Sequence, residues 1–376
     1  MIIAVNTQLL LKDKLEGIGW FAHETLKRIT QQHPEHTFYF IFDRQYSPDF
    51  IYGNNVKPII LHPQSRHPLL WILRFELLLP KLLKKIKADV YYSPDGWLTT
   101  NKKVKTVNVI HDLSFFHNKN DLPYLYQKYV DFFFPIFAKN ASKICTVSEY
   151  SKKDISKNFN IESENIQVVY NGANEIYKPI SKLDIIETQK RFTNNNEYFV
   201  YVGAINPRKN LINLFKAFDH FKENNKNEVK LLIVGAKQIW RKEIEDAYLS
   251  MRFKNDVIFT GRVSNEDLHH ILASSIALTY VSFFEGFGIP LLEAMNCEVP
   301  IITSNTTSMP EVAGDAALLV DPNSINEIAK ALSTIYSDED LRNQLIAKGK
   351  IQRENFSWQK SADLVWKAIQ DILDKC

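Results

Sequence analysis

The sequence predicts an α/β protein that consists of two β/α halves. Three observations support this fold class. Short apolar runs typical of buried strands alternate with helical patterns, glycine-containing loops follow several of the strands, and the same order of elements restarts after a polar stretch near the middle of the chain. The chain has 376 residues, for which two domains are the natural expectation. We place a first domain at 1–180, a second at 181–355 and a C-terminal helix at 356–376.

The first half opens with an apolar strand at 1–6, a loop that holds Gly17 and Gly19, and a helix at 20–29. A glycine pair between a strand and a helix is where a doubly wound domain binds its ligand. A tight turn with nothing bound explains the same pair equally well. Further strands are predicted at 38–42 and 56–61.

Residues 66–87 combine basic and apolar side chains, and Pro80 is expected to break or kink their helical pattern. The mixture is typical of an interfacial helix on anionic lipid. A helix that packs on the sheet and leaves its lysines in water has the same pattern, so both interpretations stay open. The basic residues of the stretch are Arg66, Arg74, Lys81, Lys84, Lys85 and Lys87, with Trp71, Phe75 and several leucines between them and Glu76 opposing them.

A later apolar strand of the first half, beginning at Val104, runs into His111 and Asp112. A histidine at that point lies at the carboxyl edge of the sheet, where ligands usually bind. The alternative is a buried histidine whose hydrogen bonds are satisfied within the fold. Soon after comes Ser148, which is expected to cap the helix that starts at Glu149.

Residues 176–197 hold Pro179 and the polar run TNNNE, and we interpret them as the junction between the halves. The next loop carries Arg208 and Lys209 with Gly203 close by, directly before a predicted helix. Two cations at a helix N-terminus are typical of a phosphate clamp. A basic turn that faces water is the alternative.

The stretch FFEGFGIPLLEAM carries two carboxylates, Glu285 and Glu293, with seven residues between them. Gly286 and Gly288 let the backbone turn sharply and lie close to a ligand. Pro290 suits the first turn of a helix, where its missing N–H costs nothing. An apolar strand precedes the stretch, so we expect a strand, a glycine loop and a helix N-terminus, which suits a phosphate or an array of sugar hydroxyls.

Composition and charge exclude several other classes of protein. The chain is 45% apolar and 24% charged with a net charge of +3, too mild a balance to indicate nucleic-acid binding. The cysteines, Cys145, Cys297 and Cys376, have no metal-like spacing, and reduced cytosolic thiols are expected. The N-terminus lacks the pattern of a signal peptide, and no apolar run approaches the roughly 18 residues that span a bilayer.

Taken together, the motifs resemble those of the retaining glycosyltransferases of family 4, which have the GT-B architecture. EGFGIPLLEAM is similar to the family's signature of two glutamates separated by seven residues, and VGAINPRKN resembles its phosphate-clamp loop. HDLSFF, TVSEYSKKDI, NGAN, FTGRVSNEDL and EVAGDAALLVDP follow in the family's order. The resemblance covers nearly the whole chain. It implies two Rossmann-like domains facing across a cleft, with the last helix packed back on the first domain.

The resemblance also implies roles for named residues, most of them in the second domain. The donor sugar's hydroxyls are held by Glu285 with the amides of Gly286, Phe287 and Gly288. The nucleotide is held by Glu293 at the ribose and by the backbone around Arg262 and Val263 at the base. The leaving diphosphate is neutralised by Lys209 with Arg208, in the loop that follows Gly203. From the first domain, His111 meets the donor sugar, and Gly17 and Gly19 lie near the phosphates or the acceptor.

One position departs from the family pattern. Many members have an arginine directly after the glycine of the clamp loop, where this chain has Ala204 and a loop one residue shorter. The second clamp cation is therefore open, with Arg208 as the candidate. We see no Asp-x-Asp pair in a suitable loop, so we expect no metal and no cofactor, because the cations and the helix dipole can stabilise the diphosphate.

The expected activity is transfer of a hexose from a nucleotide-diphosphate sugar to a glycan or lipid-linked acceptor in bacterial cell-surface polysaccharide synthesis. GDP-mannose is the donor favoured by general likeness to bacterial polysaccharide mannosyltransferases. A GT-B phosphorylase, a sugar-nucleotide epimerase and a non-catalytic sugar-nucleotide-binding protein are the alternatives. No acid/base pair for an epimerase can be assigned. A cytoplasmic protein is expected, in peripheral membrane contact if residues 66–87 bind lipid.

Overall fold

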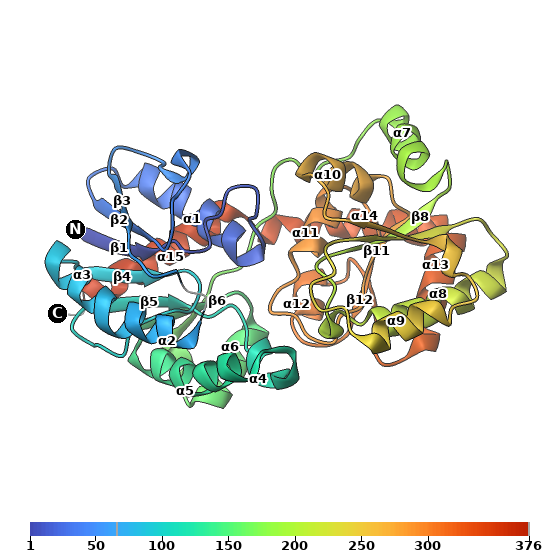
Figure 1. The fold of residues 1–376 in the computed structure, drawn as a ribbon. Helices are drawn as coiled ribbons and strands as arrows, with labels where there is room; N and C mark the ends of the chain where they lie inside the picture. The colour runs from blue at the N-terminus through green and yellow to red at the C-terminus, as the bar shows by residue number, and fades with distance from the viewer. Residues whose placement is uncertain (65–66, 375–376) are drawn as a thin grey trace. The chain divides into compact units, whose positions relative to one another are not determined.

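The structure, a computed structural model, describes residues 1–64 and 67–374, so Arg66 and Cys376 lie outside the described residues. The chain divides into two compact units (Figure 1). The first unit consists of Met1–Asn171 with Ser357–Cys376, and the second of Gly172–Phe356. The change of unit therefore falls at Asn171, nine residues before the boundary that we placed at 180.

The first unit is built on a sheet in which, among the described residues, seven strands pair in parallel in the order β3-β2-β1-β4-β5-β6-β7. The sequence order reverses between β1 and β4, and such a switch point is where an open α/β sheet usually binds its ligand. The strands are β1 (Ile2–Asn6), β2 (Thr37–Phe42), β3 (Val56–Ile60), β4 (Val90–Ser93), β5 (Lys105–Val109), β6 (Lys143–Thr146) and β7 (Ile166–Val168).

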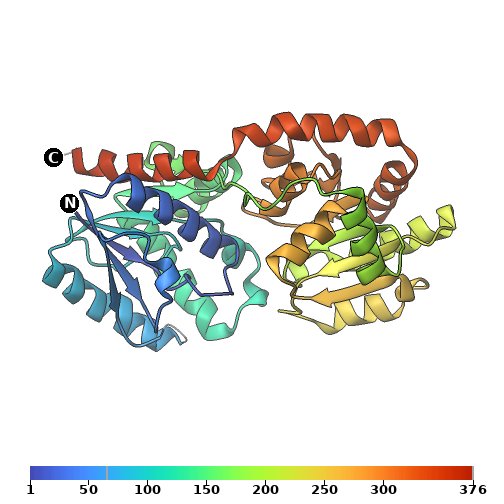
Figure 2. The same cartoon turned by 90° about the horizontal axis from the view of Figure 1, so that it is seen from above.

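Helices cover both faces of this sheet, and most residues of its central strands are buried. The helices are α1 (Gly17–Gln32), α2 (Pro68–Trp71), the π-helix η2 (Ile72–Leu78), α3 (Leu79–Ile86), α4 (Ser114–His117), α5 (Tyr124–Asn140), α6 (Glu149–Phe159) and α15 (Trp358–Asp374). Ser148 caps α6 by accepting a hydrogen bond from the Ser151 amide, as predicted. Figure 2 shows α15, in red, running beside α1, and the Phe21 and Trp358 rings meet edge to face at 6.3 Å.

The structure corrects one prediction for the first unit and shows that Arg74 of the basic stretch is buried. Gly17 and Gly19 do not form a loop, because α1 already begins at Gly17. A Cβ atom on Gly19 would lie 3.1 Å from the carbonyl oxygen of Leu9, so this glycine lets the preceding loop pack closely on the first turn of α1. Arg74 is not a surface cation: it is 1% exposed and its guanidinium donates to the carbonyl of Leu61.

The second unit repeats the plan, with six described strands paired in parallel in the order β10-β9-β8-β11-β12-β13. Its switch point lies between β8 and β11, which correspond in this order to β1 and β4. The strands are β8 (Tyr198–Val202), β9 (Lys230–Val234), β10 (Val257–Gly261), β11 (Ala277–Tyr280), β12 (Ile301–Ser304) and β13 (Leu318–Val320).

The helices of this unit are α7 (Lys182–Thr193), α8 (Leu211–Asn225), α9 (Lys242–Leu249), α10 (Asn265–Ala273), α11 (Ile289–Asn296), α12 (Met309–Ala313), α13 (Ile325–Ser337) and α14 (Glu339–Gln352). The predicted junction at 176–197 is not only a linker, since it contains α7. Ser181 and Asp184 form a capping box at the start of α7. This pair was a sequence signal for a helix, but the polar composition of the stretch favoured a linker. Ser264 caps α10, and its side chain accepts a hydrogen bond from the Asp267 amide.

Candidate functional site

The loop after β8 brings two cations to the start of α8. Arg208 and Lys209 lie in a short 3₁₀ turn, Pro207–Lys209, and Asn210 then takes a left-handed conformation (φ 61°) that leads into the helix. Asparagine tolerates this conformation better than most side chains. Its side-chain amide donates to the carbonyls of Val281 and Pro322, at 2.9 and 2.7 Å, which fixes the turn against neighbouring strands.

Glycines allow this loop to rest on the next one. Gly203 and Gly235 end β8 and β9 with φ near +145°, a region that L side chains rarely adopt. A Cβ atom on Gly235 would lie 2.0 Å from the carbonyl oxygen of Gly203, so the two backbones touch directly. Ile205 donates its amide to Ala236 at 2.8 Å and completes the contact. The cation loop is therefore held by a backbone stack at the carboxyl edge of the sheet.

The loop after β11 carries Glu285, and it lies against the cation loop because β8 and β11 are neighbours in the sheet. The Phe283 amide donates to the carbonyl of Arg208 at 2.9 Å. Gly288, with φ 93°, then begins α11, and a side chain there would collide with Met309. The predicted order of strand, glycine loop and helix N-terminus is confirmed, with Pro290 in the first turn.

Both cations are paired with Glu285. The carboxylate accepts from Arg208 Nη1 at 2.8 Å, and its other oxygen lies 2.6 Å from Lys209 Nζ. Glu285 is 6% exposed. Burial by itself would raise the pKa of this carboxyl, but the charges of Arg208 and Lys209 outweigh burial and lower the pKa to about 2. The cluster therefore carries two positive charges and one negative charge, a net cation at the start of a helix.

Such an arrangement can accept an anion. The N-terminus of α8 adds a positive dipole to the side-chain charges. A phosphate that attracts Lys209 and Arg208 would leave the carboxylate of Glu285 with fewer partners. The hydroxyls of a sugar could then donate hydrogen bonds to this carboxylate. The structure brings Arg208, Lys209 and Glu285 into one cluster, and their roles as a clamp and a sugar-binding carboxylate stay predictions.

Glu293 lies on α11, eight residues after Glu285 in the sequence, and has a different environment. Burial raises its pKa to about 7, and a hydrogen bond with Tyr177 opposes the rise. Tyr177 and the Cys297 thiol are buried nearby, and their pKa values are raised by burial and further by the charge of Glu293. This carboxyl thus changes charge near neutral pH, whereas Glu285 stays ionised.

The remaining predicted residues are distributed over both units. Gly286 and Phe287 are buried in the Glu285 loop, and the Phe287 ring meets Phe356 at 5.6 Å. Arg262 is exposed and Val263 partly buried, directly after β10. These residues, with Gly203, Arg208, Lys209 and Glu293, share the carboxyl side of the second sheet, while Gly17, Gly19 and His111 belong to the first unit.

His111 follows β5 at the carboxyl edge of the first sheet, as predicted. Its Nε2 lies 2.8 Å from the carbonyl of Pro94, and its ring meets Phe21 edge to face at 5.0 Å. Burial lowers its pKa, which favours the neutral ring that donates from Nε2. The histidine is thus held by the fold, and its predicted contact with a donor sugar remains a prediction.

Two features were missed by sequence reasoning. Tyr280 is the last residue of β11, and its hydroxyl accepts a hydrogen bond from Lys209 Nζ. A tyrosine inside an apolar strand does not indicate in the sequence that it contacts a lysine of another loop. Asp95 is buried at the switch point of the first sheet and accepts from Asn6, Gln8 and Ser93. The signal available was a polar residue after each of two strands, β1 and β4.

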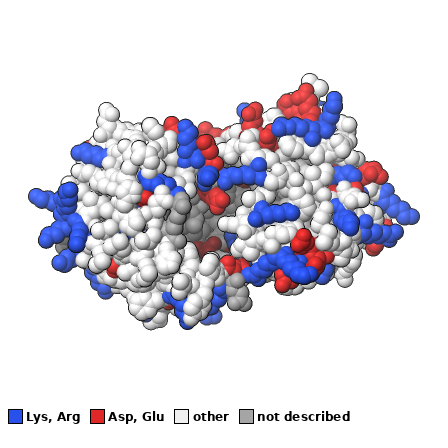
Figure 3. All heavy atoms as spheres, viewed as in Figure 1, with Lys and Arg blue, Asp and Glu red and all other residues white. Residues whose placement is uncertain are grey.

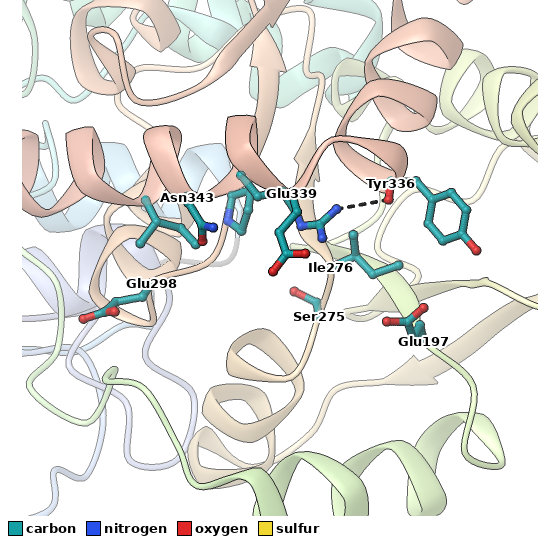
Figure 4. Close-up of a pocket in the computed structure, with 10 residues that line it drawn as sticks. Glu197, Ser275, Ile276, Glu298, Tyr336, Glu339 and Asn343 are labelled. Atoms are coloured by element: carbon teal, nitrogen blue, oxygen red, sulfur yellow. Dashed lines mark hydrogen bonds between the residues drawn. The ribbon is translucent and has the colours of Figure 1, made fainter.

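A hollow of about 460 Å³ lies on the second unit (Figure 4), and neither Arg208, Lys209 nor Glu285 lines it. Part of its lining directly precedes strands, as Glu197 does β8 and Ile276 does β11, and the rest includes residues of α13 and α14, so it lies at the amino edge of the sheet. Glu298, also in its lining, pairs with Lys350 at 2.8 Å. The hollow is open and polar and is not the candidate site.

No group of three or more His, Cys, Asp or Glu side chains that could hold a metal ion occurs among residues 1–64 and 67–374. In the same part of the chain, no helix is both long and apolar enough to cross a bilayer.

Two family models match the sequence, one in each half. The model of "Glycosyltransferase Family 4" matches residues 15–175, and that of "Glycosyl transferases group 1" matches residues 184–352. Among curated proteins, O-antigen chain mannosyltransferase B of Escherichia coli is 30% identical over 300 residues, which cover 78% of each chain. O-antigen chain mannosyltransferase RfbU of Salmonella typhimurium is 29% identical over 226 residues, 60% of this chain and 59% of the relative.

Solved structures show the same fold at lower identity. Sucrose-phosphate synthase of Thermosynechococcus elongatus aligns with a TM-score of 0.77, 16% identity and full coverage of both chains. HepE of Anabaena, solved in complex with UDP and glucose, aligns with a TM-score of 0.74 and 17% identity over 98% of this chain and 99% of HepE. At this identity the likeness concerns the arrangement of helices and strands.

Proposed function

We propose the reaction of this chain from the premise that it belongs to the group 1 glycosyltransferases of family 4. The proposed reaction moves a hexose from a nucleotide-diphosphate sugar to a glycan or lipid-linked acceptor in cell-surface polysaccharide synthesis. Two relatives named as O-antigen chain mannosyltransferases favour mannose as the sugar, and GDP-mannose as the donor to test first.

The observation that carries the proposal is the cluster of Arg208, Lys209 and Glu285 at the switch point of the second sheet. When the bond between the anomeric carbon and the diphosphate breaks, its electron pair goes to the phosphate oxygen. Two cations and the start of α8 stabilise the negative charge that develops there. In this scheme Glu285 holds the hydroxyls of the sugar while Glu293 holds the ribose.

We propose retention of the anomeric configuration. The acceptor hydroxyl attacks the anomeric carbon on the face from which the diphosphate leaves, and its proton passes to the departing phosphate oxygen. Glu285 then binds the sugar and does not attack it, which fits a carboxylate that is already paired with two cations. Nuclear magnetic resonance of the first product tests this step, because retention and inversion give different anomers.

The test of the reaction is a panel of sugar nucleotides, with nucleotide release and donor binding as separate readouts. GDP-mannose should release GDP in the presence of a mannose-containing acceptor. Release of sugar phosphate from the glycan, without a sugar nucleotide, on addition of inorganic phosphate would indicate a phosphorylase. A changed sugar on an intact nucleotide would indicate an epimerase. Binding of a donor without turnover on any acceptor would indicate a binding protein.

We further propose that the reaction needs no metal ion, since the cations of the clamp loop can take the role that a metal has in other transferases. Turnover in excess EDTA should equal turnover in untreated buffer. Loss of activity in the chelator, restored by Mg²⁺ or Mn²⁺, would contradict this proposal while leaving the transfer reaction intact.

A surface of the first unit supports peripheral contact with the inner face of a membrane. Side chains of α2 and η2 project apolar groups into solvent, with Leu69 at 68% and Leu77 at 53% exposed. The neighbouring helix α5 exposes Leu125 and Phe132, and Trp71 joins the two helices through Tyr126 at 4.9 Å. Exposed groups of this size, grouped on adjacent helices, are typical of an interaction surface.

Basic residues border this surface, as lipid binding requires. Lys81, Lys84 and Lys85 on α3 are exposed, and Figure 3 shows Lys and Arg side chains gathered at the end of the first unit where α3 lies. We expect sedimentation with anionic phosphatidylglycerol vesicles and not with neutral ones. Leu69→Glu with Leu77→Glu should abolish it, whereas Leu183→Glu with Ile186→Glu on α7, an equally exposed pair, should not.

A further inference from the structure

The pairing of Lys209 involves a third side chain that the proposed scheme does not use. Tyr280 ends β11 and is 2% exposed. The Lys209 ammonium donates to its hydroxyl and also lies 4.6 Å from the centre of its ring. Lys209 Nζ also lies 2.6 Å from Oε1 of Glu285, so this one ammonium contacts both the tyrosine hydroxyl and the carboxylate.

Burial and the nearby Glu285 raise the pKa of Tyr280 far above its usual value, so the hydroxyl keeps its proton. It therefore accepts from Lys209 as a neutral hydroxyl. A lysine side chain loses conformational entropy when it is held in one place. A hydrogen bond to a fixed neutral partner offsets part of that loss.

We propose that Tyr280 is a positioning residue for the transfer reaction. Its hydroxyl keeps the Lys209 ammonium in place while the anion that pairs with Lys209 changes from Glu285 to the diphosphate. In the free chain that anion is Glu285. When the diphosphate replaces the carboxylate as the anion near Lys209, the Tyr280 hydroxyl remains as the fixed acceptor. This inference rests on the proposed function, since it assigns Lys209 to the leaving group.

The neighbouring Tyr201 provides a matched control. Its ring stacks on that of Tyr280, with centres 6.4 Å apart and planes 18° apart, and it is equally buried. Its hydroxyl, however, donates to the carbonyl of Ala204 at 3.4 Å and has no contact with Lys209 among the described hydrogen bonds. Tyr201→Phe and Tyr280→Phe therefore remove the same group from adjacent buried rings, and only the second removes it from the lysine.

The experiment compares steady-state kinetics of the full chain, Tyr280→Phe, Tyr201→Phe, Lys209→Ala and the double variant Tyr280→Phe/Lys209→Ala. Tyr280→Phe should lower kcat about 10- to 100-fold with little change in the donor KM, as expected for losing a hydrogen bond to a charged group that acts in the transition state. Tyr201→Phe should stay within about threefold of the full chain on the same scale. Circular dichroism selects a temperature at which every variant is folded.

The double variant separates positioning from general structural damage. If Tyr280 acts through Lys209, the double variant should be no slower than Lys209→Ala alone, because the group being positioned is already absent. Multiplicative losses, or equal losses in Tyr280→Phe and Tyr201→Phe, would overturn the inference. Failure of the unaltered chain to turn over any sugar nucleotide would instead count against the proposed function.

Discussion

Each of the two sheets of this chain has a carboxylate at the same topological position, but the two carboxylates have different partners. Asp95 follows β4 and Glu285 follows β11, each beside the switch point of its sheet. Asp95 accepts from three neutral groups, at 2.8 Å from Asn6, 2.8 Å from Gln8 and 2.9 Å from Ser93. Glu285 is paired with two cations.

The pKa values follow from this difference. Burial raises the pKa of Asp95, and its neutral donors lower it only in part. Burial acts on Glu285 as well, but the two cations lower its pKa to about 2. The Asp95 network fixes the loop of Pro94, whose carbonyl lies 2.8 Å from Nε2 of His111. The Glu285 cluster can exchange its internal anion for an external one.

The largest expected effect is on turnover, and it tests whether the charged cluster is the reactive one. Lys209→Ala should lower kcat on the order of 10²–10³-fold, because a group that stabilises the leaving diphosphate is removed. Lys216→Ala, an exposed cation on α8, is the control and should leave kcat unchanged. Near-normal turnover of Lys209→Ala would remove the clamp from the mechanism and leave the two carboxylate networks functionally alike.

A second, smaller effect concerns stability in acid and separates the two carboxylates by sign. The folded pKa of Glu285 lies below its unfolded value of about 4.5, so its contribution is present above about pH 4.5 and is lost as the pH falls through about 2. The difference corresponds to about 3 kcal/mol. Asp95 has a raised folded pKa, so its contribution is present at low pH and is lost as the pH rises through that value.

Denaturant unfolding of two variants between pH 2 and pH 6 measures this difference. Glu285→Gln should flatten the rise of stability with pH that the unaltered chain shows in this range, because Glu285 supplies part of that slope. Asp95→Asn should steepen the rise or leave it unchanged, since Asp95 contributes with the opposite sign. Identical pH profiles for the two variants would show that the cations do not control Glu285 in solution.

The contrast between the two networks also shows how far the sequence could lead. Strands, glycine loops and caps such as Ser148 were predictable, because local periodicity and turn chemistry determine them. The clamp loop and Glu285 were found through their motifs. Asp95 was not, since its donors Asn6 and Gln8 are 89 and 87 residues away, and only the strand order brings them together.

Errors arose where tertiary packing overrode a local signal. Gly17 and Gly19 resembled a ligand loop, yet they lie in the first turn of α1, where a Cβ atom on Gly19 would lie 3.1 Å from the carbonyl oxygen of Leu9. Arg74 belongs to the basic stretch 66–87, yet it is buried and donates to the carbonyl of Leu61. The contact of Tyr280 with Lys209 depends on two strands being neighbours, which no single motif encodes.

The smallest expected effect concerns Glu293 in the second unit. As for Asp95, burial raises the pKa of Glu293 and a neutral hydrogen-bond partner opposes the rise. Its pKa of about 7 means that roughly a tenth of it is ionised at pH 6 and most of it at pH 8. A carboxylate accepts hydroxyl hydrogen bonds more strongly than a carboxylic acid does. If Glu293 holds the ribose, the donor KM should therefore fall up to about tenfold as the pH rises from 6 to 8.

Glu293→Gln should remove this dependence of the donor KM on pH. Tyr177→Phe should shift its midpoint to higher pH, because the hydrogen bond from Tyr177 lowers the pKa of Glu293. Donor KM measured across this range decides the matter: a flat profile in the unaltered chain would mean that the ribose is not held by the ionised form of Glu293.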